Sequence, residues 1–131
     1  MEDWSEVAAL IATAILLGVV VFQILLVQGK PWGHLAWGGQ HRGVLPKNLR
    51  IGSAISALLL LGFASIILDA GGIRDSLLSD TAVDIAKWVV FGFFVLGTLM
   101  NAASRSKPER NLWTPVNLVL AILTFIVANG S

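Results

Sequence analysis

Four long runs of apolar residues, separated by shorter polar segments, set the pattern of this chain. The first run, 7–27, has 21 positions without a charged side chain, close to the ~20 residues that an α-helix needs to cross a bilayer. The residues before it are acidic, whereas the leader of a secretory signal peptide is basic. We therefore expect 7–27 to be a membrane-spanning helix of the mature protein.

The second and third runs predict two further spans. The second span is expected over 46–68, because the fixed φ of Pro46 suits the first position of a helix. Gly71 and Gly72 follow it and are typical of a helix end. The third span is expected over 83–103.

The starts of the third and fourth helices are marked less plainly. Acidic residues favour a helix N-terminus, so the third helix is expected to begin near Ser79 or Asp80. The fourth uncharged run starts only at Pro115, with Thr114 as a candidate cap. Either this helix begins before Pro115 or the bilayer thins around it, and we expect the span over 112–128.

Composition agrees with a membrane protein. Of the 131 residues, 56% are apolar and 13% are charged, against roughly 45–50% and about 25% in soluble domains. We expect an all-α, polytopic membrane protein in which residues 1–131 form one four-transmembrane-helix bundle. The net charge of +1 gives no sign of a nucleic-acid partner, and the lack of cysteine excludes disulfides and thiolate chemistry.

Charge is distributed unevenly between the two sides of the predicted bundle. The loops after the first and third runs hold seven cations and one acid: Lys30, Arg42, Lys47, Arg50, Arg105, Lys107 and Arg110, with Glu109. The other side holds two cations among seven acids: Arg74 and Lys87, with Glu2, Asp3, Glu6, Asp69, Asp75, Asp80 and Asp84. Because basic loops stay in the cytoplasm, both termini are expected on the non-cytoplasmic side.

Polar residues within the spans gather in the predicted cytoplasmic third, and no polar line crosses the bilayer, which disfavours a monomeric water-filled pore. One explanation is hydrogen bonding between helices. The other is a shallow cavity, roofed by the glycine-rich loop 28–50, that accepts a lipid headgroup or a small polar ligand. Its candidate ligand-binding residues are Gln23, His34, His41, Arg42, Arg50, Ser53, Asn101, Arg105 and Asn117.

The two histidines suggest little chemistry beyond binding. His34 and His41 lie seven residues apart on a glycine-rich loop without a partner carboxylate or thiolate, so we expect no metal site and no cofactor. His41 with Ser53 or Asn101 is the only cluster that could serve an enzyme, and we assign no catalytic residue. Arginines of the same face could instead contact a phosphate beside His41.

Two further local patterns concern packing. Small residues at four-residue spacing allow close helix packing, either within the chain or in a homodimer. They occur at Ala8 and Ala12, at Ala14 and Gly18, and at Gly52 and Ser56 beside Ser53 and Ala57. Lys87, at the non-cytoplasmic mouth of the third span, is expected to reach water and to pair with Asp84 three residues earlier.

Two segments carry a resemblance. HRGVLPKNLRIGS (41–53) and MNAASRSKPERNLWTPV (100–116) resemble a pattern found in small uncharacterised bacterial four-helix membrane proteins. The resemblance implies the four-helix fold and a prokaryotic inner-membrane location, but it transfers no mechanism.

We therefore expect a small binding or accessory module that self-associates or docks on a larger membrane complex, with its basic face on anionic lipid. An oligomeric channel or small-molecule transporter is the alternative, although the first span has no charged residue for proton coupling. A membrane enzyme acting on a lipid or quinone is the second alternative.

Overall fold

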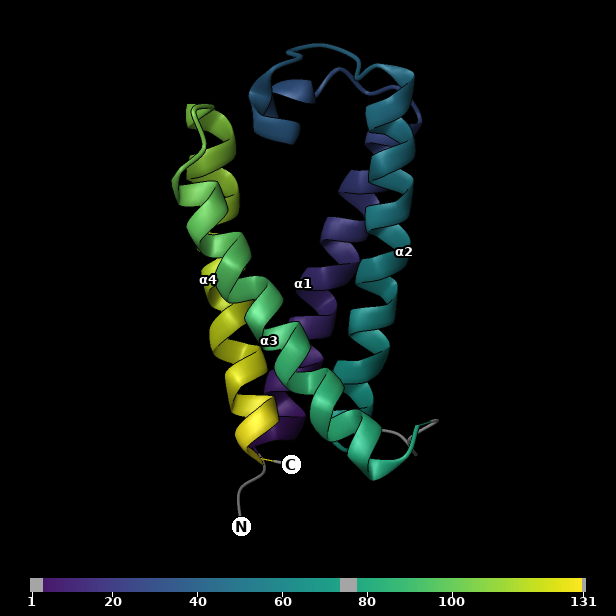
Figure 1. Ribbon diagram of the computed structural model, residues 1–131, viewed down its shortest axis with the longest axis vertical. Coiled ribbons are helices and arrows are strands. Elements are labelled where there is room, and N and C mark those ends of the chain that lie inside the picture. Colours follow the sequence, from purple (N-terminus) through teal and green to yellow (C-terminus); the bar gives the residue numbers. More distant parts are fainter. Residues whose placement is uncertain (1–3, 74–77, 131) are drawn as a thin grey trace.

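The computed structural model describes residues 4–73 and 78–130, which are all-α (Figure 1). The long helices of these residues are α1 (Trp4–Val27), α2 (Lys47–Ala70), α3 (Asp80–Ala102) and α4 (Lys107–Gly130). Each is long and apolar enough to cross a membrane, so the predicted fold class and the four predicted spans are confirmed at that level. Four charged residues named above lie outside the described residues: Glu2, Asp3, Arg74 and Asp75.

Most helix ends follow from the signals in the sequence. Helix α3 begins at Asp80, within the predicted start, and the Ser79 hydroxyl caps it by accepting a hydrogen bond from the Ala82 amide at 3.1 Å. Gly72, with φ +76°, closes the turn after α2. Pro46 lies one position before α2 rather than within it, because its backbone is extended (ψ 161°).

The start of α4 differs from the sequence expectation. The helix begins at Lys107 and contains Pro115 in its interior, so the explanation by an earlier start is correct. The prediction that Thr114 caps this helix is therefore wrong, since Thr114 lies inside α4. Ser106 takes that role, since its hydroxyl accepts a hydrogen bond from the Glu109 amide at 3.3 Å.

The helices pack as two pairs that diverge toward one end. Helix α1 packs mainly on α2, and α3 packs mainly on α4. The C-terminal end of α2 lies close to the N-terminal end of α3, and the two helices diverge from that point (Figure 1). The main apolar core joins all four helices through residues such as Leu16, Ile67, Phe94 and Leu120. We call the end with residues 28–46 and 103–106 the loop end, and the opposite end the terminal end.

The terminal end brings the first and last described turns together. A Cβ added at Gly130 would overlap the Ser5 hydroxyl, so α1 begins where α4 ends. Lys87 and Asp84 form the expected ion pair there, at 2.8 Å. The Lys87 side chain is only 6% exposed, however, so the expectation that it extends into water is wrong.

Of the two small-residue stripes named on α1, one is buried in the bundle, since Ala8 and Ala12 belong to the main core. Ala9 is fully buried, and a Cβ added at Gly71 would overlap the Ala9 side chain. Ala14 and Gly18 are exposed, and nothing described lies within 4 Å of a Cβ added at Gly18. The prediction that Ala14 and Gly18 pack within the chain is therefore wrong, because the face of α1 that contains Ala9 is the one that packs against the bundle.

Gly52 and Ser56 are also placed differently from a helix-packing pair. A Cβ added at Gly52 would lie 2.8 Å from the indole ring of Trp37, which belongs to the loop and not to a helix. Ser56 lines a cavity.

These contacts predict that Gly71→Ala destabilises the protein by about 1–3 kcal/mol, because the new methyl group overpacks the α1–α2 contact. The matched change Gly18→Ala should keep or raise stability, by up to about 1 kcal/mol, because alanine favours a helix over glycine. Thermal unfolding in mild detergent, followed by circular dichroism, measures both. Equal midpoints for Gly71→Ala and the wild type would contradict the close contact.

Candidate functional site: a loop between two pockets

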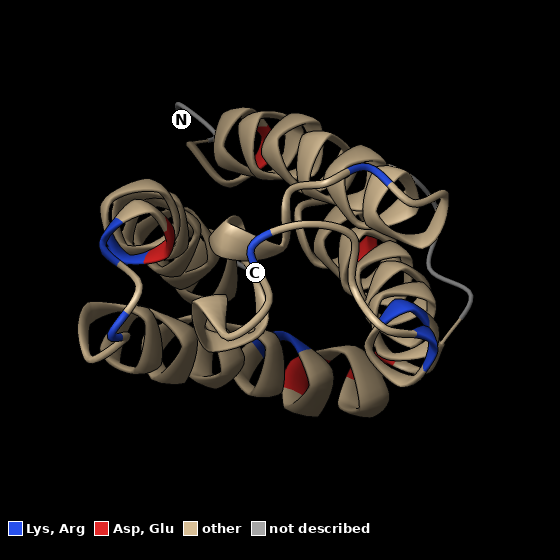
Figure 2. Cartoon of the chain, turned by 90° about the horizontal axis from the view of Figure 1, so that it is seen from above, with Lys and Arg blue, Asp and Glu red and all other residues tan. Residues whose placement is uncertain are grey.

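The loop between α1 and α2 folds back toward the bundle. It contains two short 3₁₀ turns, η1 (Gly33–Leu35) and η2 (Trp37–Gly39), which lie inside the ring of four helices when the protein is seen from above (Figure 2). The Gly33 amide donates to the Gly43 carbonyl at 2.9 Å, and a Cβ added at Gly33 would overlap the His41 carbonyl. Only glycine at this position lets the loop close on itself.

Side chains of the first turns of α4 hold the two 3₁₀ turns. The Ser106 hydroxyl donates to the His34 carbonyl at 2.7 Å, and the Trp113 indole donates to the Leu35 carbonyl at 2.6 Å. The Glu109 carboxylate accepts from the Gly38 amide at 3.0 Å. Backbone groups that would otherwise be unpaired near the apolar interior are thereby satisfied.

Trp37 fastens the loop to α2. Its indole donates to the Ser53 hydroxyl at 3.1 Å, and its ring lies on Gly52. Trp37 has a φ of +53°, a left-handed conformation that costs a residue other than glycine about 1–3 kcal/mol. The contacts of its ring and of the following Gly38 amide offset that cost.

Glu109 is the buried acid of this arrangement, with 7% of its surface exposed. Besides the Gly38 amide, it accepts a hydrogen bond from the Ser104 hydroxyl at 2.6 Å, and that hydroxyl accepts from the Ser106 amide at 3.2 Å. Within residues 4–73 and 78–130, no lysine or arginine forms a salt bridge with this carboxylate. Glu109 is not among the residues expected from the sequence, although the Ser106 to Glu109 spacing is that of a capping box.

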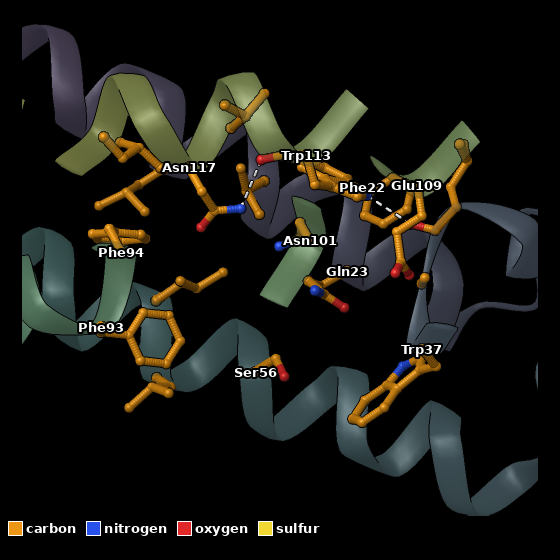
Figure 3. A pocket seen from close by; sticks show the side chains of 18 residues that line it. Phe22, Gln23, Trp37, Ser56, Phe93, Phe94, Asn101, Glu109, Trp113 and Asn117 are labelled. Atoms are coloured by element: carbon orange, nitrogen blue, oxygen red, sulfur yellow. Dashed lines mark hydrogen bonds between the residues drawn. The ribbon is translucent and has the colours of Figure 1, made fainter. Parts of the chain in front are cut away.

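Below the loop lies a cavity of about 250 Å³ between the diverging helices (Figure 3). Leu35, Ala36 and Trp37 form its side toward the loop. Its polar lining comes from all four helices, namely from Gln23, Ser56, Asn101, Glu109 and Asn117. The rest of the lining is apolar or aromatic: Leu16, Val19, Phe22, Leu59, Leu60, Phe93, Phe94, Trp113, Val116 and Leu120.

A second, basic pocket lies on the other side of η2. Gly38 and Gly39 contribute to it from the loop, and the start of α4 contributes from the opposite wall. Its basic side chains are His34, Arg42, Arg105 and Lys107. A Cβ added at Gly39 would overlap the Ser106 side chain, so glycine is needed where the loop meets α4.

The structure thus divides the single predicted cavity in two. Of the nine candidate residues, three line the cavity, namely Gln23, Asn101 and Asn117, and three line the basic pocket, namely His34, Arg42 and Arg105. Trp37 lines the cavity and Lys107 lines the basic pocket. Neither was expected from the sequence, because only the folded loop brings them to these positions.

The other three candidates are placed elsewhere. His41 is exposed and lines neither pocket. Arg50 donates to the Val27 carbonyl from Nε at 2.9 Å and from Nη2 at 2.7 Å, which caps the end of α1. Ser53 is fully buried under Trp37. The cluster of His41 with Ser53 or Asn101, considered for an enzyme, is therefore not assembled.

Searches with the whole chain found no matching protein-family model, no similar curated protein and no similar solved structure.

The Glu109 contacts predict that Glu109→Ala loosens the loop. Loss of the acceptor leaves the Gly38 amide unpaired, at a cost of about 1–3 kcal/mol, so its hydrogen exchange should accelerate roughly 5- to 150-fold. Glu109→Gln is the matched control, because its amide oxygen can still accept from Gly38. Hydrogen-exchange mass spectrometry over 33–39 measures both. Exchange in Glu109→Ala at the wild-type rate would show that Glu109 does not hold the loop.

Proposed function

We propose that the protein is a small integral membrane binding module of a prokaryotic inner membrane, and that its basic pocket binds the phosphate of an anionic lipid headgroup. In this proposal the loop end faces the cytoplasm and both termini face the opposite side. The seven cations in and beside the loops of the loop end support this orientation, since basic flanking segments are retained in the cytoplasm. Anionic headgroups are concentrated in that leaflet.

The observation that carries the proposal is the contrast between two kinds of arginine. Arg50 and Arg110 donate to backbone carbonyls, of Val27 and Ser104 respectively, and have a structural role. In the described part of the chain, the side chains of Arg42 and Arg105 form no hydrogen bond or ion pair, and both line the basic pocket. They are available to a phosphate, which arginine binds well through paired donors.

Two features add to the positive potential of the pocket. The first turn of α4, with Ser106 and Lys107, forms one wall, and the N-terminal end of a helix dipole favours an anion. Glu109, in the first turn of α4, is the one acid between residues 28 and 50 or 104 and 111, and it is buried on the cavity side of η2. Its charge therefore offsets little of the basic surface.

The proposal includes association with a second copy or with a larger membrane complex. Ala14 and Gly18 lie exposed on α1, where small side chains would let another helix approach closely in lipid. The lipid site then anchors and orients the module at the cytoplasmic face. No channel or enzyme is needed to account for these features.

The lipid site predicts a selective loss in Arg42→Gln/Arg105→Gln. This double variant should retain phosphatidylglycerol at least about 10-fold less well, because even one hydrogen bond to a charged group contributes about 1.5–3 kcal/mol. The measurement is native mass spectrometry after release from nanodiscs of mixed phosphatidylglycerol and phosphatidylcholine.

Lys30→Gln/Lys47→Gln is the matched control, because it removes the same charge from the same end, outside the pocket. It should retain phosphatidylglycerol nearly as well as the wild type. Equal losses in the two double variants would mean that diffuse surface charge, and not the pocket, attracts the lipid.

The orientation makes its own prediction. In a chain without natural cysteine, Gln40→Cys at the loop end should resist a membrane-impermeant maleimide in intact cells or spheroplasts, whereas Thr81→Cys at the terminal end should react. Both cysteines should react after the membrane is permeabilised. The opposite pattern in intact cells would reverse the proposed orientation and separate the basic pocket from the cytoplasm.

A further inference from the structure

The cavity below the loop differs in charge from the basic pocket above it. Among its lining residues, Glu109 is the ionisable one, and the lining includes no lysine, arginine or histidine. The carboxylate already accepts from Gly38 and Ser104, but two oxygens offer about four acceptor positions in all. The lining of this cavity therefore contributes one carboxyl group and no basic side chain.

The two asparagines of the lining also present oxygen atoms. The Asn101 side-chain amide donates to the Gly97 carbonyl at 2.7 Å, and that of Asn117 donates to the Trp113 carbonyl at 2.8 Å. Since only the NH₂ group can donate to a carbonyl, the orientation of both amides is fixed by chemistry. Their carbonyl oxygens receive no hydrogen bond from the described residues, and that of Asn117 lies against Gly97 of α3, where an added Cβ would come within 2.7 Å of it.

Gln23 supplies an acceptor without a partner. Its Oε1 atom is buried and receives no hydrogen bond from the described residues. A buried polar atom left in this way costs free energy that a donor from a ligand would recover. Ser56, on the facing helix α2, adds a hydroxyl group to the same lining.

Aromatic side chains complete the site. Phe22 packs edge-on against Trp113 at 4.8 Å between ring centroids, and Trp37 and Phe94 line other parts of the cavity (Figure 3). Aromatic faces attract cations. Leu59 and Phe93 line the cavity while remaining 45% and 40% exposed, so the cavity reaches the outer surface where α2 and α3 diverge.

We propose that this cavity is a second binding site, which takes a small hydrophobic amine in its protonated form. The ammonium group would bind beside Glu109 and donate to the unpartnered Oε1 atom of Gln23, and the apolar body would lie among the aromatic rings. A molecule of this kind can arrive through the apolar opening between α2 and α3. The site is independent of the phosphate pocket, because the η2 turn separates the two.

Phenethylamine is a suitable probe, with phenethyl alcohol and hydrocinnamate as neutral and anionic molecules of similar shape. The protein is placed in nanodiscs of phosphatidylcholine, which carry no net charge, and binding is followed by tryptophan fluorescence, since Trp37 and Trp113 line the cavity. We expect saturable binding of phenethylamine, at least 10-fold weaker binding of the alcohol, and no saturable binding of hydrocinnamate.

Three variants locate the binding. Glu109→Gln should weaken phenethylamine binding at least 10-fold while binding of the alcohol changes little. Asp80→Asn is the matched control, because it removes a carboxylate from the terminal end, and it should bind phenethylamine as the wild type does. Ser56→Leu, which fills the cavity from α2, should abolish binding of both probes and tests the location without changing the loop contacts.

The proposal is overturned if phenethylamine causes no saturable change, or if it and the alcohol bind equally well and Glu109→Gln has no effect. The second result would show a cavity for neutral apolar molecules. Because the nanodiscs contain no anionic lipid, neither result depends on the phosphate pocket. Loss of phosphatidylglycerol selectivity in the arginine variants likewise leaves the amine site untouched.

Discussion

The hydrogen bond from the Gly38 amide to the buried Glu109 carboxylate is the interaction on which the loop end depends. A loop that folds back toward an apolar bundle must find partners for its amides and carbonyls, because neither lipid nor apolar side chains can supply them. Glu109 satisfies one amide, and its neighbours Ser106 and Trp113 satisfy two carbonyls of the same loop. The first turns of α4 therefore hold the loop in place.

Once the loop is held, the loop end is divided into two spaces of opposite character. Arg42 and Arg105 lie on the outer side of η2, where their guanidinium groups have no partner among residues 4–73 and 78–130, whereas Glu109 and amide oxygens lie on the inner side. A guanidinium group inside the cavity would form an ion pair with Glu109, and neither charged group would then be available to a ligand. Glu109 is buried while Arg42 and Arg105 are exposed, so the two spaces differ in the charge of their lining.

The two ends of the bundle differ because different side chains separate the helices. At the terminal end, Ala9 and Gly71 let α1 and α2 approach closely. At the loop end, Trp37 and Trp113 stand between the helix pairs, and their rings fill part of the space but leave a cavity of about 250 Å³. The cavity thus results from small residues at the terminal end of the bundle and aromatic residues, on the loop and on α4, at the loop end.

The sequence by itself determined the four helices, the start of α3 near Ser79 or Asp80 and the uneven charge of the two ends, because hydropathy, helix-start signals and charge act over a few neighbouring residues. Gln23, Asn101 and Asn117, which were named from the sequence as candidate ligand-binding residues, line a cavity in the structure. Only the tertiary structure decided which face of α1 is buried, Ala9 rather than Ala14, since small residues on two faces satisfy the same spacing rule. It also decided the roles of Trp37 and Glu109, because a contact between a loop and a helix 71 residues later leaves no trace in local pattern.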